Sequence, residues 1–356
     1  MPNGLVLADD ATGALECASL LASLQLAVSL TSSIEPQPGI RVADTESRHL
    51  APEHAAARIR HWLAPIQWIE GAQVFKKTDS TLRGNIAAEL VAMLQANVSV
   101  PLVYVPAYPA LGRTVIEGRL FVHGIPVAET EFAIDARQPV RSSAIADLFP
   151  QSLRGIIVPI ADAAALNAAL HDYGGKILVC DAASDKDIDR LAAVLGQSTA
   201  RPWLAGPAGF VKAWAAIGAF PRRVPPHFPN PSKWLVVCGS LHPQSRRQAS
   251  IAEAMGLDVV QSGTETTQPP EFVAAELARQ ALDSILKERP QAVLIMGGDT
   301  VRALWRAMGI RDLIPLPELL PGIAACLTPD KDLLFVTKAG GFGDDRLVER
   351  ILDRLK

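Results

Sequence analysis

Two adjacent carboxylates follow the first apolar run of the chain. Residues 4–8 (GLVLA) lead into Asp9 and Asp10, and residues 11–14 (ATGA) come next, where a helix is expected to begin. A carboxylate in this position can cap the helix and favour its positive N-terminal end. It can also accept hydrogen bonds from substrate hydroxyls or take a proton from one. The residues alone leave both interpretations open.

Residues 76–85 (KKTDSTLRGN) bring cations, hydroxyls and the expected start of a helix into one segment. Lys and Arg donate charge-assisted hydrogen bonds to a carboxylate or phosphate, and free N–H groups at a helix start add to that preference. The segment therefore predicts an anion-binding loop, with a solvated, capped turn as the alternative. Arg48, after residues 44–47 (DTES), is a further cation at an expected strand end.

Three glycine-containing segments each follow an expected strand in the second half of the chain. They are residues 237–243 (VCGSLHP), 296–300 (MGGDT) and 338–344 (KAGGFGD). A glycine turn lets a phosphate approach the backbone closely. Three such turns at successive strand ends favour a nucleotide-phosphate site. No GxxxxGK[ST] segment occurs, so the chain has no P-loop. No GxGxxG follows the first strand, as a dinucleotide-binding fold would require.

Composition excludes several classes of protein. The 356 residues include 34 Lys+Arg and 37 Asp+Glu, a net charge of −3, which gives no reason to expect nucleic-acid binding. The uncharged stretch at residues 17–34 is rich in Ser and does not predict a membrane span. The seven histidines form no zinc pattern. The four cysteines are far apart, so we expect free thiols in a reducing cytoplasm.

Short apolar runs alternate with helical periods along most of the chain, which predicts an α/β fold. In open parallel sheets, ligands bind outside the carboxyl ends of the strands. The polar clusters at residues 9–13, 44–48 and 77–84 are therefore expected to face one crevice. Residues 106–150 interrupt this pattern, with a short hairpin predicted over residues 120–127 that turns at His123–Gly124.

A proline-rich segment predicts the boundary between two domains. Prolines occupy positions 221, 225, 226, 229 and 231, which suits a semi-rigid linker and neither a helix nor a central strand. We expect a first domain over residues 1–220, a linker over 221–232 and a second domain over 233–356. Each domain is predicted to be a mainly parallel sheet flanked by helices.

Six segments, taken together, resemble the four-carbon acid sugar kinase family. They are residues 7–14 (LADDATGA), 76–85 (KKTDSTLRGN), 106–114 (PAYPALGRT), 139–143 (PVRSS), 297–300 (GGDT) and 338–343 (KAGGFG). The resemblance runs in family order over most of the chain. It implies ATP-dependent phosphorylation of the terminal hydroxyl of a four-carbon sugar acid such as threonate or erythronate. It also implies an N-terminal domain for the acid and a C-terminal domain for the nucleotide.

Carried over by position, the resemblance implies which residues contact each substrate. The sugar-acid contacts would be Asp10, Arg48, Lys77, Asp79, Ser80, Arg83 and Gly84. The ATP contacts would be Ser240, Gly297, Gly298, Asp299, Thr300 and Gly340. Our mechanistic hypothesis is that Asp10 orients the terminal hydroxyl and accepts its proton. Arg48, Lys77 or Arg83 would hold the carboxylate. Mg²⁺ would bridge the ATP phosphates, with Asp299 as a partner directly or through water.

Departures from the family pattern keep two alternatives open. Ala11 stands where a phenylalanine is expected, Gly341 replaces the usual asparagine, and residues 150–230 look shortened. One alternative is a catalytically silent protein that binds the sugar acid and the nucleotide. The other is a nicotinamide-dependent sugar-acid dehydrogenase, against which the missing GxGxxG counts. The loop at residues 77–84 resembles threonate and erythronate kinases more than 3-oxo-tetronate kinases. The stereoisomer and the oligomeric state, a homo-oligomer included, are left undecided.

Overall fold

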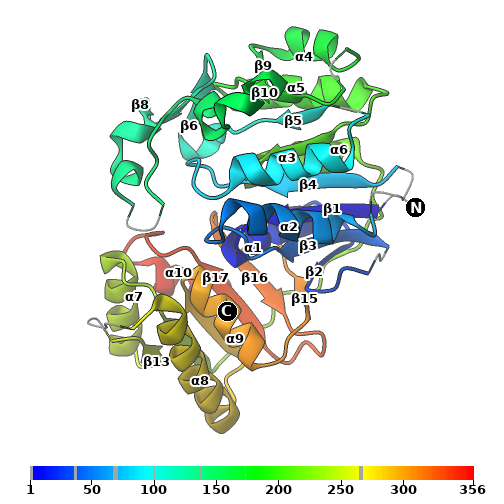
Figure 1. Cartoon of the computed structure of the whole chain (residues 1–356). Coiled ribbons are helices and arrows are strands. Elements are labelled where there is room, and N and C mark those ends of the chain that lie inside the picture. Colours follow the sequence, from blue (N-terminus) through cyan, green and yellow to red (C-terminus); the bar gives the residue numbers. More distant parts are fainter. Residues whose placement is uncertain are drawn as a thin grey trace. The chain divides into compact units, whose positions relative to one another are not determined.

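A computed structural model describes residues 3–35, 38–66, 71–99, 101–135, 138–172, 174–263 and 268–356. The chain divides into two compact units, whose elements are labelled in Figure 1. Unit 1 comprises Met1–Gly13 and Ile34–Pro221. Unit 2 comprises Ala14–Ser33 and Arg222–Lys356.

Unit 1 is built on a parallel sheet with strand order β3-β1-β4-β11-β5-β10-β9. Its strands are β1 (Asn3–Ala8), β3 (Gly39–Asp44), β4 (Gln73–Lys77), β5 (Leu102–Tyr104), β9 (Ile157–Ile160), β10 (Ile177–Cys180) and β11 (Trp203–Gly206). Its helices are α2 (Pro52–Leu63), α3 (Ile86–Ala96), α4 (Ala163–Ala169), α5 (Asp185–Gln197) and α6 (Ala208–Ile217). Helix α2 packs beside α3, and α5 contacts both α4 and α6.

The strands of unit 1 are mainly apolar, as expected of parallel strands in a sheet that helices cover. Phe75 on β4 packs against Phe210 and Trp214 of α6, with ring centroids 6.2 and 5.9 Å apart. Trp214 in turn packs against Phe220 at 4.7 Å. These aromatic contacts bind α6 to the centre of the sheet. The polar strand ends belong to β4 and to β1 and β3 on one side of it.

Unit 2 has the strand order β13-β12-β14-β17-β16-β15-β2. Its strands are β2 (Val28–Thr31), β12 (Trp234–Cys238), β13 (Asp258–Gln261), β14 (Ala292–Met296), β15 (Asp312–Pro315), β16 (Ile323–Leu327) and β17 (Leu334–Lys338). The first four in the order are parallel, whereas β16, β15 and β2 pair in antiparallel fashion. Its helices are α7 (Pro243–Ala254), α8 (Pro270–Glu288), α9 (Gly298–Ala307) and α10 (Leu347–Arg354), together with most of α1 (Ala11–Ser23).

The expected single boundary near residue 220 differs from the division in the structure, because residues 14–33 pair with the C-terminal part of the chain. Strand β2 pairs with β15, and the Ser19 hydroxyl lies 3.5 Å from the Ala325 carbonyl oxygen. The backbone N–H of Glu318 also donates to the Ser23 hydroxyl at 3.0 Å. Local sequence patterns do not predict pairing between strands as distant in the chain as β2 and β15. The other boundary, after Pro221, falls at the start of the predicted linker.

The predicted hairpin over residues 120–127 is confirmed. Strands β7 (Arg119–Val122) and β8 (Ile125–Pro126) are antiparallel, and both residues of the turn between them, His123 and Gly124, have positive φ. The prediction missed β6 (Arg113–Ile116), which pairs with β7. Short 3-10 helices lie before and after the hairpin in the chain: Pro109–Leu111, Val127–Glu129, Glu131–Ile134, Ile145–Leu148 and Gln151–Ile156.

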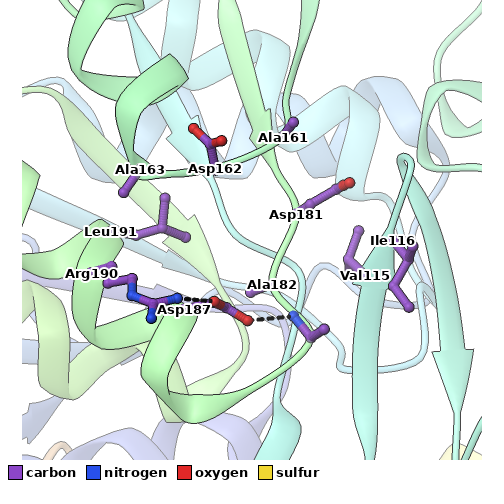
Figure 2. A pocket seen from close by; sticks show the side chains of 11 residues that line it. Val115, Ile116, Ala161, Asp162, Ala163, Asp181, Ala182, Asp187, Arg190 and Leu191 are labelled. Carbon is purple, nitrogen blue, oxygen red and sulfur yellow. Dashed lines mark hydrogen bonds and ion pairs between the residues drawn. The ribbon is translucent and has the colours of Figure 1, made fainter.

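A cavity of about 220 Å³ lies between β6 and the carboxyl ends of β9 and β10 (Figure 2). On one side, the Asp181 carboxylate accepts hydrogen bonds from the backbone N–H groups of Glu117 and Gly118, at 2.6 and 2.9 Å. On another, Asp187 accepts a hydrogen bond from Arg190 at 3.0 Å. The Asp181 bonds fix the turn after β6 to the end of β10, and so hold the hairpin in place.

In the described ranges we find no helix with the length and apolar character that a membrane span requires. The cysteines Cys17, Cys180, Cys238 and Cys326 are buried free thiols, as expected.

Candidate active site

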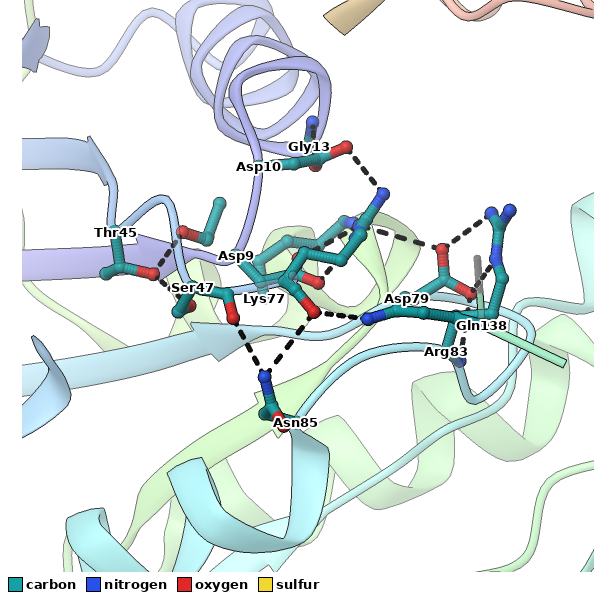
Figure 3. Close-up of polar contacts among 12 residues, drawn as sticks. Asp9, Asp10, Gly13, Thr45, Ser47, Lys77, Asp79, Arg83, Asn85 and Gln138 are labelled. Carbon is teal, nitrogen blue, oxygen red and sulfur yellow. Dashed lines mark hydrogen bonds and ion pairs between the residues drawn. The ribbon is translucent and has the colours of Figure 1, made fainter. Parts of the chain in front are cut away.

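The carboxyl ends of β1, β3 and β4 lie level in unit 1. Ala8, the last residue of β1, pairs with Asp44 on β3 and with Lys77 on β4. The segments that follow these strands therefore leave the sheet together. Figure 3 shows their side chains in contact. The structure thus brings the three predicted polar clusters into one site.

Arg48 lies at the centre of this site. Its Nε and Nη2 donate to the two oxygens of Asp9 at 2.7 and 3.0 Å, and its Nη1 donates to Asp10 at 2.6 Å. Nη2 also lies 3.6 Å from Asp79. Burial by itself raises the pKa of the Asp9 carboxyl, but the charges of Arg48 and Lys76 outweigh it and lower that pKa to about 2. Arg48 is therefore the common counter-ion of three carboxylates.

Asp79 connects this centre to the loop that follows β4. Its Oδ1 accepts the backbone N–H of Thr81 at 2.9 Å, and its Oδ2 accepts Nη2 of Arg83, also at 2.9 Å. Arg83 further donates to Asp135 at 3.1 Å. Although burial raises the pKa of Asp79, Arg48 and Arg83 hold it well below its usual range. The loop is thus fixed around a carboxylate that stays ionised.

Asp10 and Lys77 meet at the first turn of α1. Asp10 Oδ1 accepts the backbone N–H of Gly13 at 2.9 Å, so the capping interpretation of this carboxylate is correct. A Cβ on Gly13 would lie 2.8 Å from both Asp10 Oδ1 and Lys77 Nζ. The missing side chain therefore lets the buried ammonium approach the helix start. Ser80, three residues after Lys77, is partly exposed.

Gly84 and Asn85, just before α3, and the distant Gln138 all contact the segments around Arg48. Gly84 has a φ of +92°, and a Cβ there would lie 3.1 Å from Asp9 Oδ2. The Asn85 amide donates to the carbonyl oxygens of Ser47 and Leu50, at 2.9 and 2.8 Å. Gln138 donates to the Arg48 carbonyl oxygen. Sequence reasoning missed Asp135 and Gln138, because no local pattern connects residues so distant along the chain.

A buried ion pair lies beneath these residues. Lys76 and Glu89 have side-chain exposures of 0% and 1%, and Lys76 Nζ lies 3.1 Å from Glu89 Oε2. Lys76 also donates to the Lys77 carbonyl oxygen at 3.0 Å, and Ser47 donates to Glu89. Successive strand residues point to opposite faces, so Lys76 and Lys77 have different partners. The prediction named Lys77 alone as a substrate contact, and the structure places Lys76 in this buried ion pair.

Arg113 on β6 is another cation near the site. Its Nη1 donates to the Leu111 carbonyl oxygen, and its buried Nε has no hydrogen-bond partner in the described part of the chain. Burial lowers the pKa of its guanidinium, while the charges of Asp79 and Glu131 raise it. The sequence offered one signal for this residue: it lies in the segment 106–114 that resembles the family.

In unit 2, three strand ends again lie level. Cys238 on β12 pairs with Met296 on β14, which pairs with Lys338 on β17. All three strands are parallel, so the predicted glycine loops after them meet at one edge of the sheet. Gly297, with a φ of +118°, precedes α9, and His242 precedes α7. Two helix N-termini and three glycine turns therefore face the same side.

Close packing explains the glycines of these loops. A Cβ on Gly239 would lie 1.9 Å from the Thr300 Oγ1, and one on Gly340 would lie 2.7 Å from the Ser240 Oγ. Ser240 also accepts the backbone N–H of His242 at 3.2 Å. Thr300 is buried and supports Gly239 from behind. Ser240 and Gly340 are thus placed side by side, as a phosphate site built from main-chain groups requires.

Asp299 lies in the first turn of α9. Its side chain is 45% exposed, and its Oδ1 is 4.0 Å from Nη1 of Arg302. Within the described ranges, no group of three His, Cys, Asp or Glu side chains is arranged to hold a metal ion. Mg²⁺ commonly binds through one or two carboxylates and the substrate's phosphates, and an exposed Asp299 fits that donor set.

Comparison with known proteins gives the class to which these sites belong. Residues 4–214 match the sugar-binding N-terminal domain family, and residues 253–348 match the nucleotide-binding C-terminal domain family. A D-threonate kinase of Salmonella typhimurium is 28% identical over 417 aligned positions, covering 96% of this chain and 95% of that protein. A D-erythronate kinase of Heliobacterium modesticaldum is 32% identical over 270 aligned positions, which cover 71% of this chain and 61% of that protein.

A solved structure extends the likeness. A Bordetella bronchiseptica protein, crystallised as a domain-swapped dimer with bound citrate, is 26% identical in sequence. The two structures superpose with a TM-score of 0.54, and the match covers 99% of this chain and 98% of that one. The chain belongs to the four-carbon acid sugar kinase family. It is a phosphotransferase that acts on a four-carbon acid sugar, and its nucleotide-binding domain implies the use of ATP. The predicted family, enzyme class and α/β fold are confirmed.

Proposed function

We propose that this chain transfers the γ-phosphoryl group of MgATP to the terminal hydroxyl of threonate or erythronate. The observation that carries the proposal is the set of three carboxylates, Asp9, Asp10 and Asp79, that surround Arg48 in the sugar-binding unit. Carboxylates accept hydrogen bonds from the hydroxyls of a polyol chain. The names of the relatives, D-threonate kinase and D-erythronate kinase, support this choice of acids.

Asp10 is the proposed proton acceptor. Its side chain is 16% exposed, whereas that of Asp9 is 2% exposed and is held by Arg48 in a bidentate pair. In the proposed step, the substrate's terminal oxygen forms a bond to the γ-phosphorus and the bond from that phosphorus to the β,γ-bridging oxygen breaks. ADP leaves, and the hydroxyl proton passes to the Asp10 carboxylate. Gly13 and Arg48 hold this carboxylate in one orientation throughout.

The cation for the substrate's carboxylate is best supplied by Lys77 or Arg113. Arg48 and Arg83, the other two predicted candidates, each bind at least two protein carboxylates. Lys77 lies against the N-terminal turn of α1, whose N–H groups also favour an anion. Arg113 keeps a buried Nε without an acceptor in the described residues. Citrate bound to the Bordetella bronchiseptica relative supports an anionic acid as ligand.

The proposed ATP contacts are Ser240, Gly297, Gly298, Asp299, Thr300 and Gly340. The glycine loops would bind the phosphates through main-chain N–H groups, and Thr300 would act from its buried position by supporting Gly239. Mg²⁺, when bound, would neutralise charge on the phosphates. Asp299 would hold it, directly or through water.

The test is a coupled ADP-release assay with MgATP and D-threonate, L-threonate, D-erythronate, L-erythronate, 3-oxo-tetronate or glycerate. We expect rapid turnover with one threonate or erythronate isomer and slow turnover with glycerate, which lacks one hydroxymethylene unit. Faster turnover with 3-oxo-tetronate would overturn the choice of acid and leave the kinase class intact. Light scattering after size-exclusion chromatography would test the homo-oligomer, which we propose because the Bordetella bronchiseptica relative forms a dimer.

A further inference from the structure

Lys338 is a buried cation at the nucleotide-binding edge of unit 2. It ends β17, just before the loop that contains Gly340, and is 1% exposed. Its Nζ donates to the Ser245 Oγ and to the Gly340 carbonyl oxygen, both at 2.9 Å. Both acceptors are neutral, and no carboxylate in the described part of the chain pairs with it. Burying an ammonium group without a counter-ion is costly, so this position calls for an explanation.

Among the described residues, the strands beside Lys338 provide no compensating charge. Lys338 lies in register with Met296 on β14 and with Ile323 on β16, both apolar. Cys238 on β12 is the nearby titratable group, and burial raises the pKa of its thiol. Burial likewise lowers the pKa of Lys338, to about 8, with Cys238 opposing the shift.

Helix α7 also packs against Lys338. Its Ser245 contacts Lys338 directly, and the cationic Arg246 and the N-cap residue His242 are neighbours of that serine in the chain. The loop after Gly340 contributes two carboxylates. Asp344 accepts a hydrogen bond from Arg350 at 2.8 Å, and Asp345 accepts one from Gln244 at 3.0 Å. These acids are thus engaged elsewhere.

The contacts of Lys338 fix one peptide unit of the phosphate-binding edge. Ser245 accepts from Lys338 and donates to the same Gly340 carbonyl oxygen that Lys338 contacts. Gly340 is packed so closely on Ser240 that a Cβ there would lie 2.7 Å from Ser240 Oγ. A change at Lys338 would therefore move the loop that borders Ser240.

We propose that Lys338 is a positioning residue of the nucleotide site, which fixes the Gly340 loop and supplies a buried positive charge whose counter-ion is the phosphate chain of the bound nucleotide. The proposal rests on the proposed ATP site. Charges interact more strongly in a low-dielectric interior than in water, so Lys338 can act on the phosphates without touching them. The anion completes an ion pair that the free protein lacks.

Calorimetric titration of the full chain with AMP, ADP and ATP, at constant Mg²⁺, tests this charge. Lys338→Met removes the charge and keeps the length of the side chain. We expect ADP and ATP affinity to fall by about 10-fold or more, corresponding to a charge-assisted interaction, and AMP affinity to fall less. Lys287→Met, at an exposed lysine of α8 in the same unit, is the matched control and should bind all three like the wild type.

The pH dependence of ADP binding gives a readout that a purely structural role would not change. Only the protonated ammonium attracts phosphate, and the lowered pKa means that the free protein loses this proton near pH 8. ADP affinity of the wild type should therefore fall as pH rises from 7.5 to 9.5, and that of Lys338→Met should fall much less. This window lies above the range in which an unperturbed histidine titrates.

Ser245→Ala keeps the experiment decisive if Lys338→Met does not fold. It removes the hydroxyl between Lys338 and Gly340 but leaves the charge, so the fall of affinity with pH should persist. Two results would overturn the role of Lys338 without contradicting the ATP site. One is an equal loss of AMP, ADP and ATP affinity in Lys338→Met, and the other is a wild-type ADP affinity that does not change with pH. A wild type that binds no nucleotide would overturn both.

Discussion

The two units place their sites at the same kind of edge but build them from different groups. In unit 1, the ends of β1, β3 and β4 carry Asp9, Arg48 and Asp79, charged side chains bound to one another. In unit 2, the ends of β12, β14 and β17 carry glycines packed on small hydroxyl side chains. A sugar acid is distinguished by the positions of its hydroxyls, which directional side chains can read. A phosphate chain presents repeated anionic oxygens, which main-chain N–H groups can bind.

The difference extends to the buried lysines. Lys76 in unit 1 is paired with Glu89, so its charge is balanced before any substrate arrives. Lys338 in unit 2 has neutral acceptors. A site whose charges are balanced internally stays ordered without its ligand. A site with an excess cation is instead completed by an anion. Variants at these positions can break or sharpen this contrast.

The largest expected effect is at the buried pair of unit 1. Lys76→Met leaves Glu89 buried without its counter-ion, and breaking a buried ion pair in this way costs about 3–5 kcal/mol of unfolding free energy. Urea unfolding measures the loss, and Lys186→Met, at an exposed lysine of α5, is the control. The double variant Lys76→Met/Glu89→Gln should recover part of the stability. A loss of unfolding free energy below about 1 kcal/mol would show that the pair contributes little to stability.

The second prediction concerns Asp10. Asp10→Asn keeps an oxygen that can accept the N–H of Gly13 but cannot take a proton from the substrate, so kcat should fall by about 10²-fold or more. The coupled assay measures it. Asp162→Asn makes the same change at the N-cap of α4, where the side chain accepts the N–H of Ala165, and should leave kcat unchanged. Turnover near the wild-type rate in Asp10→Asn would assign the base to another group.

The third prediction tests the cation for the substrate's carboxylate. Arg113→Gln should lower kcat/KM for the acid by about 10–100-fold, the range for a hydrogen bond to a charged group. For the uncharged amide of the same acid, the loss should be much smaller. Arg119→Gln, at an exposed position of the same hairpin, is the control. An equal loss for acid and amide would assign Arg113 a structural role and leave Lys77 as the partner.

The fourth prediction follows from the pKa of Asp9, which is lowered from 3.8 to about 2. A carboxyl with a lowered pKa stabilises the fold above its unfolded pKa and loses that contribution as pH falls through its folded value. Stability should therefore decline by about 2 kcal/mol from this group as pH falls from near 4 to near 2, at 1.36 kcal/mol per unit. Urea unfolding at several pH values measures the decline. In Arg48→Met, the stability should decline less over this pH range. An unchanged decline would show that Arg48 does not lower the pKa of Asp9.

Much of this arrangement could be predicted from sequence because it depends on local rules. Apolar runs ending in polar clusters identified the strand ends, and the geometry of parallel sheets then placed Asp9, Arg48 and Asp79 together. The antiparallel pairing of β2 with β15 could not be predicted, because it joins residues far apart in the chain. The same holds for the hydrogen bond from Gln138 to Arg48. The partner of each lysine depends on which face of β4 it occupies, and the apolar pattern of a strand buried on both faces does not reveal that.

The smallest expected effect is at an ion pair whose geometry looks stronger than that of Lys76 and Glu89. Glu276 and Arg279 on α8 lie 2.6 Å apart, closer than the 3.1 Å of the buried pair, and hydrogen bonds from Arg279 help to lower the pKa of Glu276 to about 2. Both side chains are more than half exposed, so water and salt screen their attraction. Glu276→Gln should therefore leave the urea midpoint unchanged. A shift as large as that of Lys76→Met would mean that distance, and not burial, sets the strength of ion pairs in this protein.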